Sequence, residues 1–461
     1  MSQPQATEFD AVVLGAGSGG YATALRAAQL GMSVALIERD KIGGTCLHAG
    51  CIPTKALLHV AEAAESVRHS ASLGLRATVD GVDAAGVRKF TDGVVTRLYR
   101  GLQGLVAAAP GIVSVVGAGR LSDSHTVTVD GIHYIGRHLV LATGSAPRTL
   151  PGVRLGGRIL SSTEALQLPE IPSRVVIIGG SVIGVEFASA WRSLGSEVTI
   201  VEALPSLVPQ EDPALSRQLE RAFRRRKIGV RTGARVAEVE QRDDDATVVL
   251  ADGEKLDADY VLVAVGRAPV TGDLGLEAVG IKTEQGFVRT DERLRTTVPH
   301  AYAVGDLVRG LQLAHRGFAH GTFVAEQIAG LNPAPVTDAL IPRVTYCEPE
   351  LASVGLTESQ ARERYGDGVR TYEYNLGGNG RSQIRGTTGL VKLVQEPGGA
   401  VAGVHMIGSR IGEQVGEASL WVNLGLHPDQ VAGIVHAHPT QNEALGEAAL
   451  VLAGKPLHAH A

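Results

Sequence analysis

Two short apolar runs near the start of the chain frame a glycine-rich turn. Ala11 to Leu14 lead into Gly15-Ala16-Gly17-Ser18-Gly19-Gly20 and a helical stretch from Tyr21 to Leu30. A second apolar run, Ser33 to Ile37, ends at Glu38. This order predicts a strand, a turn, a helix and a second strand. Such glycines let the backbone approach a pyrophosphate at a helix N-terminus, and the acid accepts a ribose hydroxyl, so the pattern predicts a dinucleotide site.

The same pattern recurs in the middle of the chain. Val175 to Ile178 precede Gly179-Gly180-Ser181-Val182-Ile183-Gly184, a helix to about Leu194, a strand from Glu197 to Val201, and Glu202. Ser181 occupies the second glycine position, where the backbone comes closest to the pyrophosphate. A carboxylate at Glu202 repels a 2′-phosphate, which favours NAD over NADP. Two sites suggest electron transfer between a flavin and a nicotinamide, and the alternative is a duplicated α/β unit with one vestigial site.

Composition narrows the class of protein. The chain has 461 residues, 44% of them hydrophobic, a net charge of −5 and 58 glycines. The length suggests about three domains, and the charge gives no reason to expect nucleic acid or an anionic membrane as partner. Residues 1–10 have no apolar core and no arginine-rich amphipathic stretch, so we expect no signal or transit peptide and a cytoplasmic protein. Three cysteines do not form a secreted-type disulfide framework.

Two of these cysteines lie close together after the first nucleotide unit. They belong to the run Gly43-Gly44-Thr45-Cys46-Leu47-His48-Ala49-Gly50-Cys51-Ile52-Pro53-Thr54-Lys55. Five residues of ideal helix rise about 7.5 Å, which exceeds the usual disulfide Cα separation. A bond between Cys46 and Cys51 therefore needs a distorted helix start, which glycine and proline allow. A reducing compartment favours a redox-active pair. Metal binding is the rival hypothesis, but Cys347 is isolated and the spacing does not suit zinc, so we predict no metal site.

A histidine near the C-terminus has an acid five residues away. His438 and Glu443 belong to the run His436-Ala437-His438-Pro439-Thr440-Gln441-Asn442-Glu443. Such a pair suits a base oriented by a carboxylate, which a thiol–disulfide reaction needs because only the thiolate attacks. The alternative is a loop histidine that is solvated or buried.

Together, these motifs are similar to those of one known family. The twin turns, the cysteine segment, Ala142-Thr143-Gly144-Ser145, Tyr302-Ala303-Val304-Gly305-Asp306 and the two-histidine motif resemble the flavin-dependent pyridine nucleotide-disulfide oxidoreductases. The resemblance covers nearly the whole chain, in order. Within the family, residues Cys51 to His59 and the two-histidine motif most resemble the dihydrolipoamide dehydrogenase branch.

The resemblance implies an α/β fold with two Rossmann-like domains, for FAD and NAD, and a C-terminal α+β dimerisation domain. We expect an FAD domain at 1–147, an NAD domain at 148–268, a segment at 269–340 that returns to the FAD domain, and a dimer-interface domain at 341–461. Within the last part, Gly389 to Val394 and Gly403 to Gly408 read as strands. Helical patterns run from about Ile411 to Asn423 and from about Asn442 to Ala453.

The resemblance also implies residue roles. Cys46 exchanges with substrate, Cys51 forms the charge-transfer contact with the flavin, His438 is the acid–base catalyst, and Glu443 orients it. Glu186 is expected near the flavin and nicotinamide as a partner of Lys55. The residues expected to bind the cofactors FAD and NAD are Gly15, Gly17, Gly20, Glu38, Lys55, Gly119, Thr143, Gly144, Ser145, Asp306, Gly179, Gly180, Ser181, Gly184, Glu186, Glu202 and Gly266.

In the implied reaction, dihydrolipoyl thiols reduce the Cys46–Cys51 disulfide, and the electrons pass through FAD to NAD+. The implied partners are a second subunit, which supplies His438, and lipoyl domains of a dihydrolipoyl acyltransferase or of the glycine cleavage carrier protein. The alternatives are another disulfide reductase of the family or a non-catalytic NAD-binding flavoprotein subunit. Glu202, without nearby arginines, argues against an NADP-dependent glutathione reductase.

Some positions depart from the family pattern or carry no motif. His48 stands where asparagine is common, and its closeness to both thiols could alter their pKa values; His320 replaces a usual glutamate. We interpret the run Arg224 to Lys227 as a solvated helix face, Asp243 to Asp245 as a hairpin turn, and Cys347 as a packed strand residue. His458 and His460 belong to a tail and receive no role.

Overall fold

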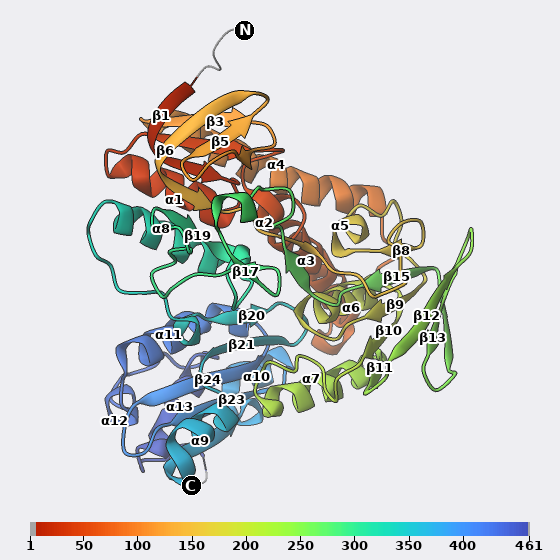
Figure 1. Cartoon of the computed structure of the whole chain (residues 1–461). Coiled ribbons are helices and arrows are strands. Elements are labelled where there is room, and N and C mark those ends of the chain that lie inside the picture. Colours follow the sequence, from red (N-terminus) through yellow and green to blue (C-terminus); the bar gives the residue numbers. More distant parts are fainter. Residues whose placement is uncertain (1–5, 460–461) are drawn as a thin grey trace. The chain divides into compact units, whose positions relative to one another are not determined.

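The chain folds into two compact units, each assembled from three separate stretches of sequence. The computed structural model describes residues 6–459. Within them, the first unit takes residues 6–56, 85–148 and 267–338, and the second takes residues 57–84, 149–266 and 339–459. In Figure 1 the colours follow residue number from red to blue, so the separate stretches of each unit have different colours. Residues 1–5, which are part of the segment expected to contain no leader peptide, lie outside the described residues. His460 also lies outside them.

A sheet with a parallel centre forms the core of the first unit. Its strand order is β3-β2-β1-β6-β5-β4, and β19 pairs in parallel with β6, so a strand from late in the sequence joins early ones. Val12, Leu36 and Val140 of this sheet are fully buried. The strands are β1 (Ala6–Leu14), β2 (Val34–Glu38), β3 (Ile112–Val116), β4 (Arg120–Leu121), β5 (Thr126–Val129), β6 (Ile132–Leu141) and β19 (Ala301–Ala303).

The first strand is longer than predicted. The predicted strand from Ala11 to Leu14 is only the second part of β1, whose earlier residues pair with β6 from His133 to Gly136. These earlier positions include polar residues that carry no apolar signal, and their strand conformation comes from the partner strand. The expected helix corresponds to α1 (Ser18–Gln29).

Two helices of the first unit approach each other through glycines. α1 packs against α8 (Ala314–Ile328). A Cβ atom at Gly321 would lie 2.3 Å from the carbonyl oxygen of Gly19, so a larger residue there would push the helices apart. The close approach brings the late segment against the first nucleotide turn.

The second unit contains a parallel sheet of order β11-β10-β9-β15-β8. α6 (Val182–Leu194) lies between β9 and β10, as predicted. Asp243 to Asp245 form the turn of the antiparallel β12–β13 hairpin, which confirms that prediction. The strands of the parallel sheet are β8 (Ile159–Leu160), β9 (Arg174–Ile178), β10 (Glu197–Glu202), β11 (Gly229–Thr232) and β15 (Tyr260–Val263). A separate antiparallel sheet consists of β12 (Val236–Gln241), β13 (Ala246–Leu250) and β14 (Lys255–Ala258).

The same unit also contains an antiparallel sheet of order β20-β21-β24-β23-β22. The two predicted strands correspond to β23 and β24, and the predicted helices to α11 and α13, except that residues 411–413 form a 3-10 turn. Trp421 of α11 and Leu445 of α13 are buried in the core beside this sheet. The elements are β20 (Arg343–Thr345), β21 (Glu350–Gly355), β22 (Arg370–Asn375), β23 (Leu390–Gln395), β24 (Val401–Gly408), α9 (Glu358–Tyr365), α10 (Gly380–Arg385), α11 (Val415–Leu424), α12 (Pro428–Val431) and α13 (Glu443–Leu452).

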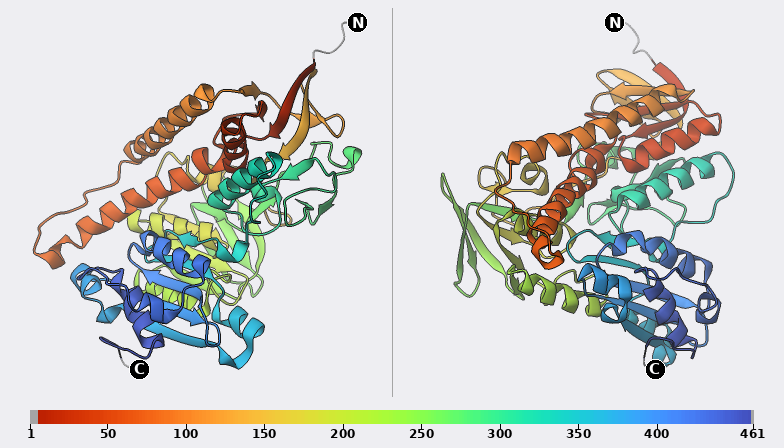
Figure 2. Two further views of the ribbon diagram at one scale, coloured as in Figure 1. Left: turned by 90° about the vertical axis from the view of Figure 1, so that its left-hand side faces the viewer. Right: turned by 180° about the vertical axis from the view of Figure 1, so that it is seen from behind.

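The longest helices within residues 6–459 are α3 (Cys51–Arg68) and α4 (Ala84–Ala108), both visible in Figure 2. No helix in this described part of the chain combines the length and the apolar character needed to cross a membrane. The remaining short elements are α2 (Gly44–His48), α5 (Ser162–Ala165), β7 (Ser145–Pro147), β16 (Arg267–Pro269), β17 (Thr283–Glu284) and β18 (Phe287–Val288).

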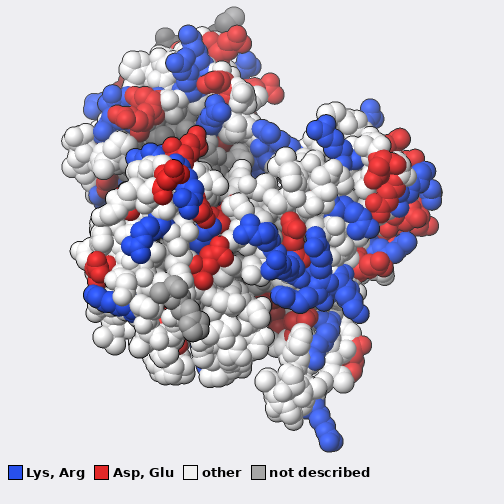
Figure 3. All heavy atoms as spheres, turned by 90° about the horizontal axis from the view of Figure 1, so that it is seen from below, with Lys and Arg blue, Asp and Glu red and all other residues white. Residues whose placement is uncertain are grey.

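The basic run is not a uniformly solvated face. It ends α7 (Pro213–Arg225), and Arg224, Arg225 and Lys227 are exposed. Arg226 instead turns inward and donates hydrogen bonds to Ser189 Oγ at 2.7 Å and to the carbonyl oxygen of Glu348 at 2.7 Å. Burial lowers the pKa of Arg226, and the nearby charge of Glu348 partly offsets this decrease. On the face shown in Figure 3, basic side chains gather right of the centre, and acidic side chains form groups at the right-hand edge and elsewhere.

Cys347 is buried, as predicted, but it does not lie in a strand. It occupies the loop between β20 and β21, where its Sγ donates to the carbonyl oxygen of Pro349 at 3.1 Å. Burial raises the pKa of Cys347 well above its usual range, so the thiol stays protonated. Pro349, two residues later, cannot donate to a strand ladder, so β20 and β21 do not join into one strand through Cys347,.

Candidate active site

The two glycine turns have the same backbone geometry. Gly15 and Gly179 have φ of 99° and 111°, which favour glycine,. The amide of Gly15 donates to Ile37 and that of Gly179 donates to Val201, both at 2.8 Å. A Cβ atom at either glycine would lie 2.4 Å from a carbonyl oxygen of a neighbouring strand end.

The last glycine of each turn allows close packing of the helix on its strand. A Cβ atom at Gly20 would lie 1.8 Å from the carbonyl oxygen of Gly15, and one at Gly184 would lie 1.9 Å from that of Gly179. No other residue fits without moving the helix. Both helix N-termini therefore stay next to the turn, where their amides could donate to a bound anion.

Each predicted acid reaches back to its own turn. Glu38 Oε2 accepts the amide of Ala16 at 2.7 Å. Glu202 Oε2 accepts the amide of Gly180 at 2.6 Å, and its Oε1 accepts that of Leu204 at 2.8 Å. A carboxylate oxygen has two lone pairs, so each acid keeps acceptors for ribose hydroxyls.

The second turn tolerates its serine. Gly17 and Ser181 have nearly the same backbone angles, with ψ of −171° and −170°. A Cβ atom at Gly17 would meet no protein atom within 4 Å, so this position faces open space in the first turn. The equivalent side chain of Ser181 is exposed. A pyrophosphate could occupy this open space, so the first turn fits a dinucleotide such as FAD.

The two cysteines lie on either side of a break between helices. Cys46 is in α2, and Cys51 begins α3, with Ala49 and Gly50 between the helices. The break is the helix distortion that the cysteine spacing required. The amide of Gly43 donates to Ala16 at 2.8 Å, and a Cβ atom at Gly44 would lie 2.7 Å from Gly17 Cα. The cysteine loop is thus attached directly to the first nucleotide turn.

Both cysteines are thiols in this structure. The hydrogen bond with Cys51, followed by burial, raises the pKa of Cys46 well above its usual range, whereas the charge of Lys55 lowers it. Two thiols in contact can form one disulfide and release two electrons. Because the reduced Cys46 stays protonated, an exchange reaction in which Cys46 is the attacking thiol needs a separate base.

A polar network lies beside the cysteine loop. Ser145 Oγ donates to Asp306 Oδ2 at 2.5 Å. Arg267 donates from Nε to Ser145 Oγ at 2.7 Å and from Nη2 to Thr45 Oγ1 at 3.5 Å. The network therefore joins two predicted cofactor residues to the residue before Cys46. Sequence reasoning missed Arg267, although it directly follows the predicted Gly266.

Four other predicted residues occupy backbone or core positions. Thr143 Oγ1 donates to the carbonyl oxygen of Val270 at 2.6 Å. Gly119 lies against the sheet core, where a Cβ atom would be 2.6 Å from Leu14 Cδ1. Gly144 and Gly266 both have positive φ, of 71° and 101°.

The two histidines that depart from the family pattern have structural partners. His48 contacts the carbonyl oxygen of Ile42 at 2.9 Å and packs edge-on against Tyr99. The pKa of Cys46 responds to Cys51, Lys55 and Asp306 instead. Burial and then the charge of Arg316 lower the pKa of His320 to about 4, and its Nδ1 accepts the amide of Gly305 at 3.3 Å.

The C-terminal pair is formed as predicted. His438 Nδ1 lies 2.9 Å from Glu443 Oε2. The histidine side chain is 75% exposed and the glutamate 16%, so the carboxylate is fixed and the imidazole faces outward. This pair belongs to the second unit, as does Glu186, which is buried and accepts the amide of Tyr346 at 2.9 Å.

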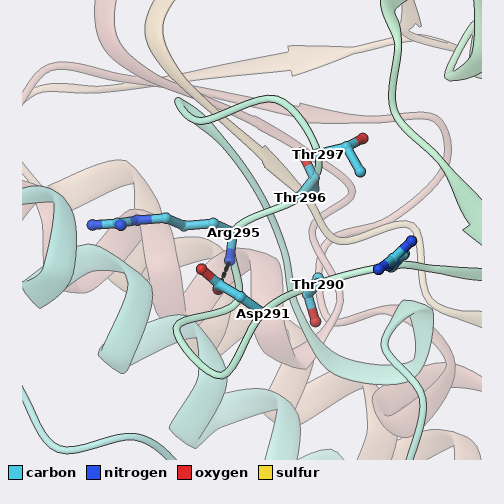
Figure 4. Close-up of a pocket in the computed structure, with 6 residues that line it drawn as sticks. Thr290, Asp291, Arg295, Thr296 and Thr297 are labelled. Atoms are coloured by element: carbon cyan, nitrogen blue, oxygen red, sulfur yellow. Dashed lines mark hydrogen bonds between the residues drawn. The ribbon is translucent and has the colours of Figure 1, made fainter.

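A pocket in the first unit involves none of the predicted residues. Its volume is about 340 Å³, and it is formed by Arg289, Thr290, Asp291, Arg295, Thr296 and Thr297. In Figure 4 the side chain of Arg295 extends away from Thr296 and Thr297. The pocket therefore does not gather charged groups around a common point.

Comparison with known proteins identifies the family. Residues 9–321 match the family model described as pyridine nucleotide-disulphide oxidoreductase, and residues 341–449 match its dimerisation domain. The chain belongs to this family. It is a flavoprotein disulfide oxidoreductase with FAD and NAD as cofactors, and its dimerisation domain supports a homodimer.

The similarity to family members extends over the full length. The chain is 39% identical to a dihydrolipoyl dehydrogenase of Bacillus subtilis over 462 residues, which cover 98% of each chain. The crystal structure of LpdA from Mycobacterium tuberculosis superposes with a TM-score of 0.90 at 26% identity, covering 97% of this chain and 99% of that one. The HOCl-induced flavoprotein disulfide reductase RclA from Escherichia coli superposes with a TM-score of 0.86 at 27% identity, covering 96% and 100%.

Proposed function

We propose that this protein is a dihydrolipoyl dehydrogenase, which oxidises dihydrolipoyl groups with NAD+. The observation that carries the proposal is the contact between the Cys46 and Cys51 thiols on a loop bonded to the first nucleotide turn. The full-length similarity to a dihydrolipoyl dehydrogenase supports the choice of substrate.

In the proposed reaction the protein's own residues move the thiol protons. His438 accepts a proton at Nε2 from a dihydrolipoyl thiol, and the thiolate attacks Sγ of Cys46 in the oxidised Cys46–Cys51 disulfide. The disulfide breaks and Cys51 leaves as a thiolate. The second dihydrolipoyl thiol then attacks the lipoyl sulfur bound to Cys46, the bond between that sulfur and Cys46 breaks, and the proton of the second thiol passes to Cys46. The products are oxidised lipoyl, the Cys46 thiol, the Cys51 thiolate and protonated His438. FAD, held by the first turn and Glu38, would supply a two-electron acceptor for the reduced cysteine pair and a hydride donor for NAD+.

We assign the nucleotide sites by their connection to the cysteines. The first turn and Glu38 would hold FAD, because the cysteine loop is bonded to that turn. The second turn and Glu202 would hold NAD, and Asp306, with Ser145, would face the flavin side chain. We keep the expected domain boundaries at 1–147, 148–268, 269–340 and 341–461, with the third segment belonging to the FAD domain.

The proposed assembly is a homodimer in which His438 acts on the cysteine pair of the other subunit. The proposed partners are the lipoyl domains of an acyltransferase or of the glycine cleavage carrier protein. We also propose a cytoplasmic location, supported by the low cysteine content of the chain,.

The test is anaerobic NADH formation by the purified protein given dihydrolipoamide and NAD+, with NADP+ as the paired control. We expect rapid turnover with NAD+ only. The Cys46→Ser variant should lose this turnover but still transfer electrons from NADH to an artificial acceptor, which bypasses the thiols. If the wild-type protein is yellow and dimeric but shows no NAD+-dependent turnover, the proposal of a lipoyl substrate is wrong.

A further inference from the structure

We infer that Asn379 is a positioning residue for His438, acting through Glu443. The inference rests on the proposed function, in which His438 is the base. Asn379 is 1% exposed and directly precedes α10. Its Nδ2 donates to Glu443 Oε1 at 3.2 Å and to the carbonyl oxygen of Thr440 at 2.8 Å.

The other end of the amide fixes its orientation. Asn379 Oδ1 accepts the amide of Ser382 at 2.9 Å and its hydroxyl at 3.0 Å, which caps α10. Both donors and both acceptor positions of the side chain are therefore used. A flipped amide would place its oxygen against Glu443 and lose all four interactions, so the buried Nδ2 group must face the carboxylate.

This arrangement holds both oxygens of the glutamate. Oε1 receives the hydrogen bond from Asn379, and Oε2 contacts His438 Nδ1 at 2.9 Å. A carboxylate held in this way keeps the imidazole proton on Nδ1 and leaves Nε2 as the basic atom. Because the His438 side chain is 75% exposed, the orientation of its ring depends on Glu443 rather than on packing.

The residue after Asn379 is close to the histidine itself. A Cβ atom at the next residue, Gly380, would lie 3.9 Å from His438 Cε1 and 3.9 Å from Pro439 Cβ. The start of α10 therefore forms one wall of the His438 site. The contact joins parts of the second unit that are distant in sequence, since Asn379 and Glu443 are separated by 64 positions.

The Asn379→Asp variant tests the role of the donor. Aspartate keeps the oxygen that caps α10, loses the hydrogen bond donor and adds a negative charge beside Glu443. We expect kcat for dihydrolipoamide oxidation to fall about tenfold to hundredfold with little change in KM, which is the effect of losing one hydrogen bond to a charged group. The acidic limb of the pH profile should move to higher pH, because the added charge favours the protonated imidazole.

Asn375→Asp is the matched control. Asn375 caps the preceding 3-10 turn, residues 376–378, by accepting the amide of Gly377 at 2.8 Å, and its side chain is exposed. The control adds the same charge next to a helix cap. We expect its kcat and its pH profile to equal those of the wild type.

A second measurement needs no substrate. In protein labelled with ¹⁵N-histidine, the fraction of neutral His438 rings with the proton on Nδ1 should fall in Asn379→Ser, with His438→Gln used to assign the signal. The serine variant retains a capping hydroxyl and adds no charge, so it serves if the aspartate variant does not fold.

The outcomes separate the two proposals. If the wild type oxidises dihydrolipoamide but the Asn379 variants keep its pH profile and its Nδ1 protonation, the positioning role is wrong and the proposed function stands. If the wild type shows no such turnover, the proposed function fails. The ¹⁵N measurement then still decides whether Asn379 orients His438.

Discussion

Replacing Lys392 with methionine should destabilise the second unit. Lys392 lies on β23, its side chain is 5% exposed, and its Nζ contacts Asp212 Oδ1 at 3.0 Å and Glu358 Oε2 at 2.7 Å. Asp212 has no exposed surface, and it caps α7 by accepting the amide of Ala214 at 3.0 Å. Methionine retains most of the lysine volume, so the substitution removes the charge and leaves the packing nearly unchanged.

The size of the effect follows from the charge that stays behind. Removing one partner of a buried ion pair costs about 3–5 kcal/mol, because the other charge stays buried. The amides of Ala214 and Glu358 still donate to Asp212, at 3.0 and 3.2 Å, which favours the lower end of that range. With an m-value of about 3 kcal/mol/M, the urea midpoint should fall by about 1 M.

The loss should depend on pH. Burial raises the pKa of Asp212, but the Ala214 amide, His405 and Lys392 outweigh it, and the net pKa is lowered. A lowered pKa means that the carboxylate contributes its full stability above about pH 5 and loses it as the pH falls. In the methionine variant the isolated carboxylate is protonated more easily. The difference in unfolding free energy between variant and wild type should therefore shrink as the pH falls toward 4.

The two tryptophans provide the assay. Trp191 and Trp421 both lie in the second unit and are 2% and 1% exposed, so their fluorescence follows its unfolding in urea. Lys255→Met is the control, because Lys255 is an exposed lysine on β14. A Lys392→Met midpoint within about 0.2 M of the wild type at pH 7, or an equal loss at pH 7 and pH 4.5, would refute the ion-pair reasoning.

Three further outcomes follow from the site and the fold. Glu202→Ala should lower kcat/KM for NAD+ about tenfold or more, since a carboxylate acceptor is lost, and should reduce the ratio of kcat/KM with NAD+ to kcat/KM with NADP+, since the charge is lost. An unchanged ratio in steady-state assays would contradict this. Arg226→Met should cost about 2–4 kcal/mol in urea unfolding, because it leaves buried partners unpaired, whereas Arg225→Met should stay within about 0.5 kcal/mol. A hydrogen bond to Glu417 raises the pKa of His436 despite burial, so His436→Gln should destabilise most below about pH 6.5 and less as the pH rises; equal losses at pH 6 and pH 8.5 would argue against that ion pair,.

Local sequence pattern predicted the geometry of the two glycine turns well. The glycines, the helix and the strand of each unit follow one another within a few residues, so the chain length between Gly15 and Glu38 places the acid near its turn. The same holds for Gly179 and Glu202, whose hydrogen bonds repeat those of the first site. Recognition of His438 and Glu443 as a pair also depended on short spacing.

Residues whose partners lie far along the chain escaped prediction. The sequence does not distinguish Arg226 from its exposed neighbours, whereas in the fold it donates hydrogen bonds to Ser189 and to the Glu348 carbonyl oxygen. Arg267 and Asn379 have no motif of their own, and their partners come from other elements of the same unit.

The sequence by itself determined the fold class, the two nucleotide turns and the cysteine pair, because backbone conformation at glycines and the spacing of apolar residues act over a few positions. Tertiary structure alone decided which polar groups are buried together: Asn379 with Glu443, Lys392 with Asp212, and Arg267 with Ser145. A buried polar group must find a partner wherever the chain brings one, and that partner depends on the whole fold rather than on neighbouring residues.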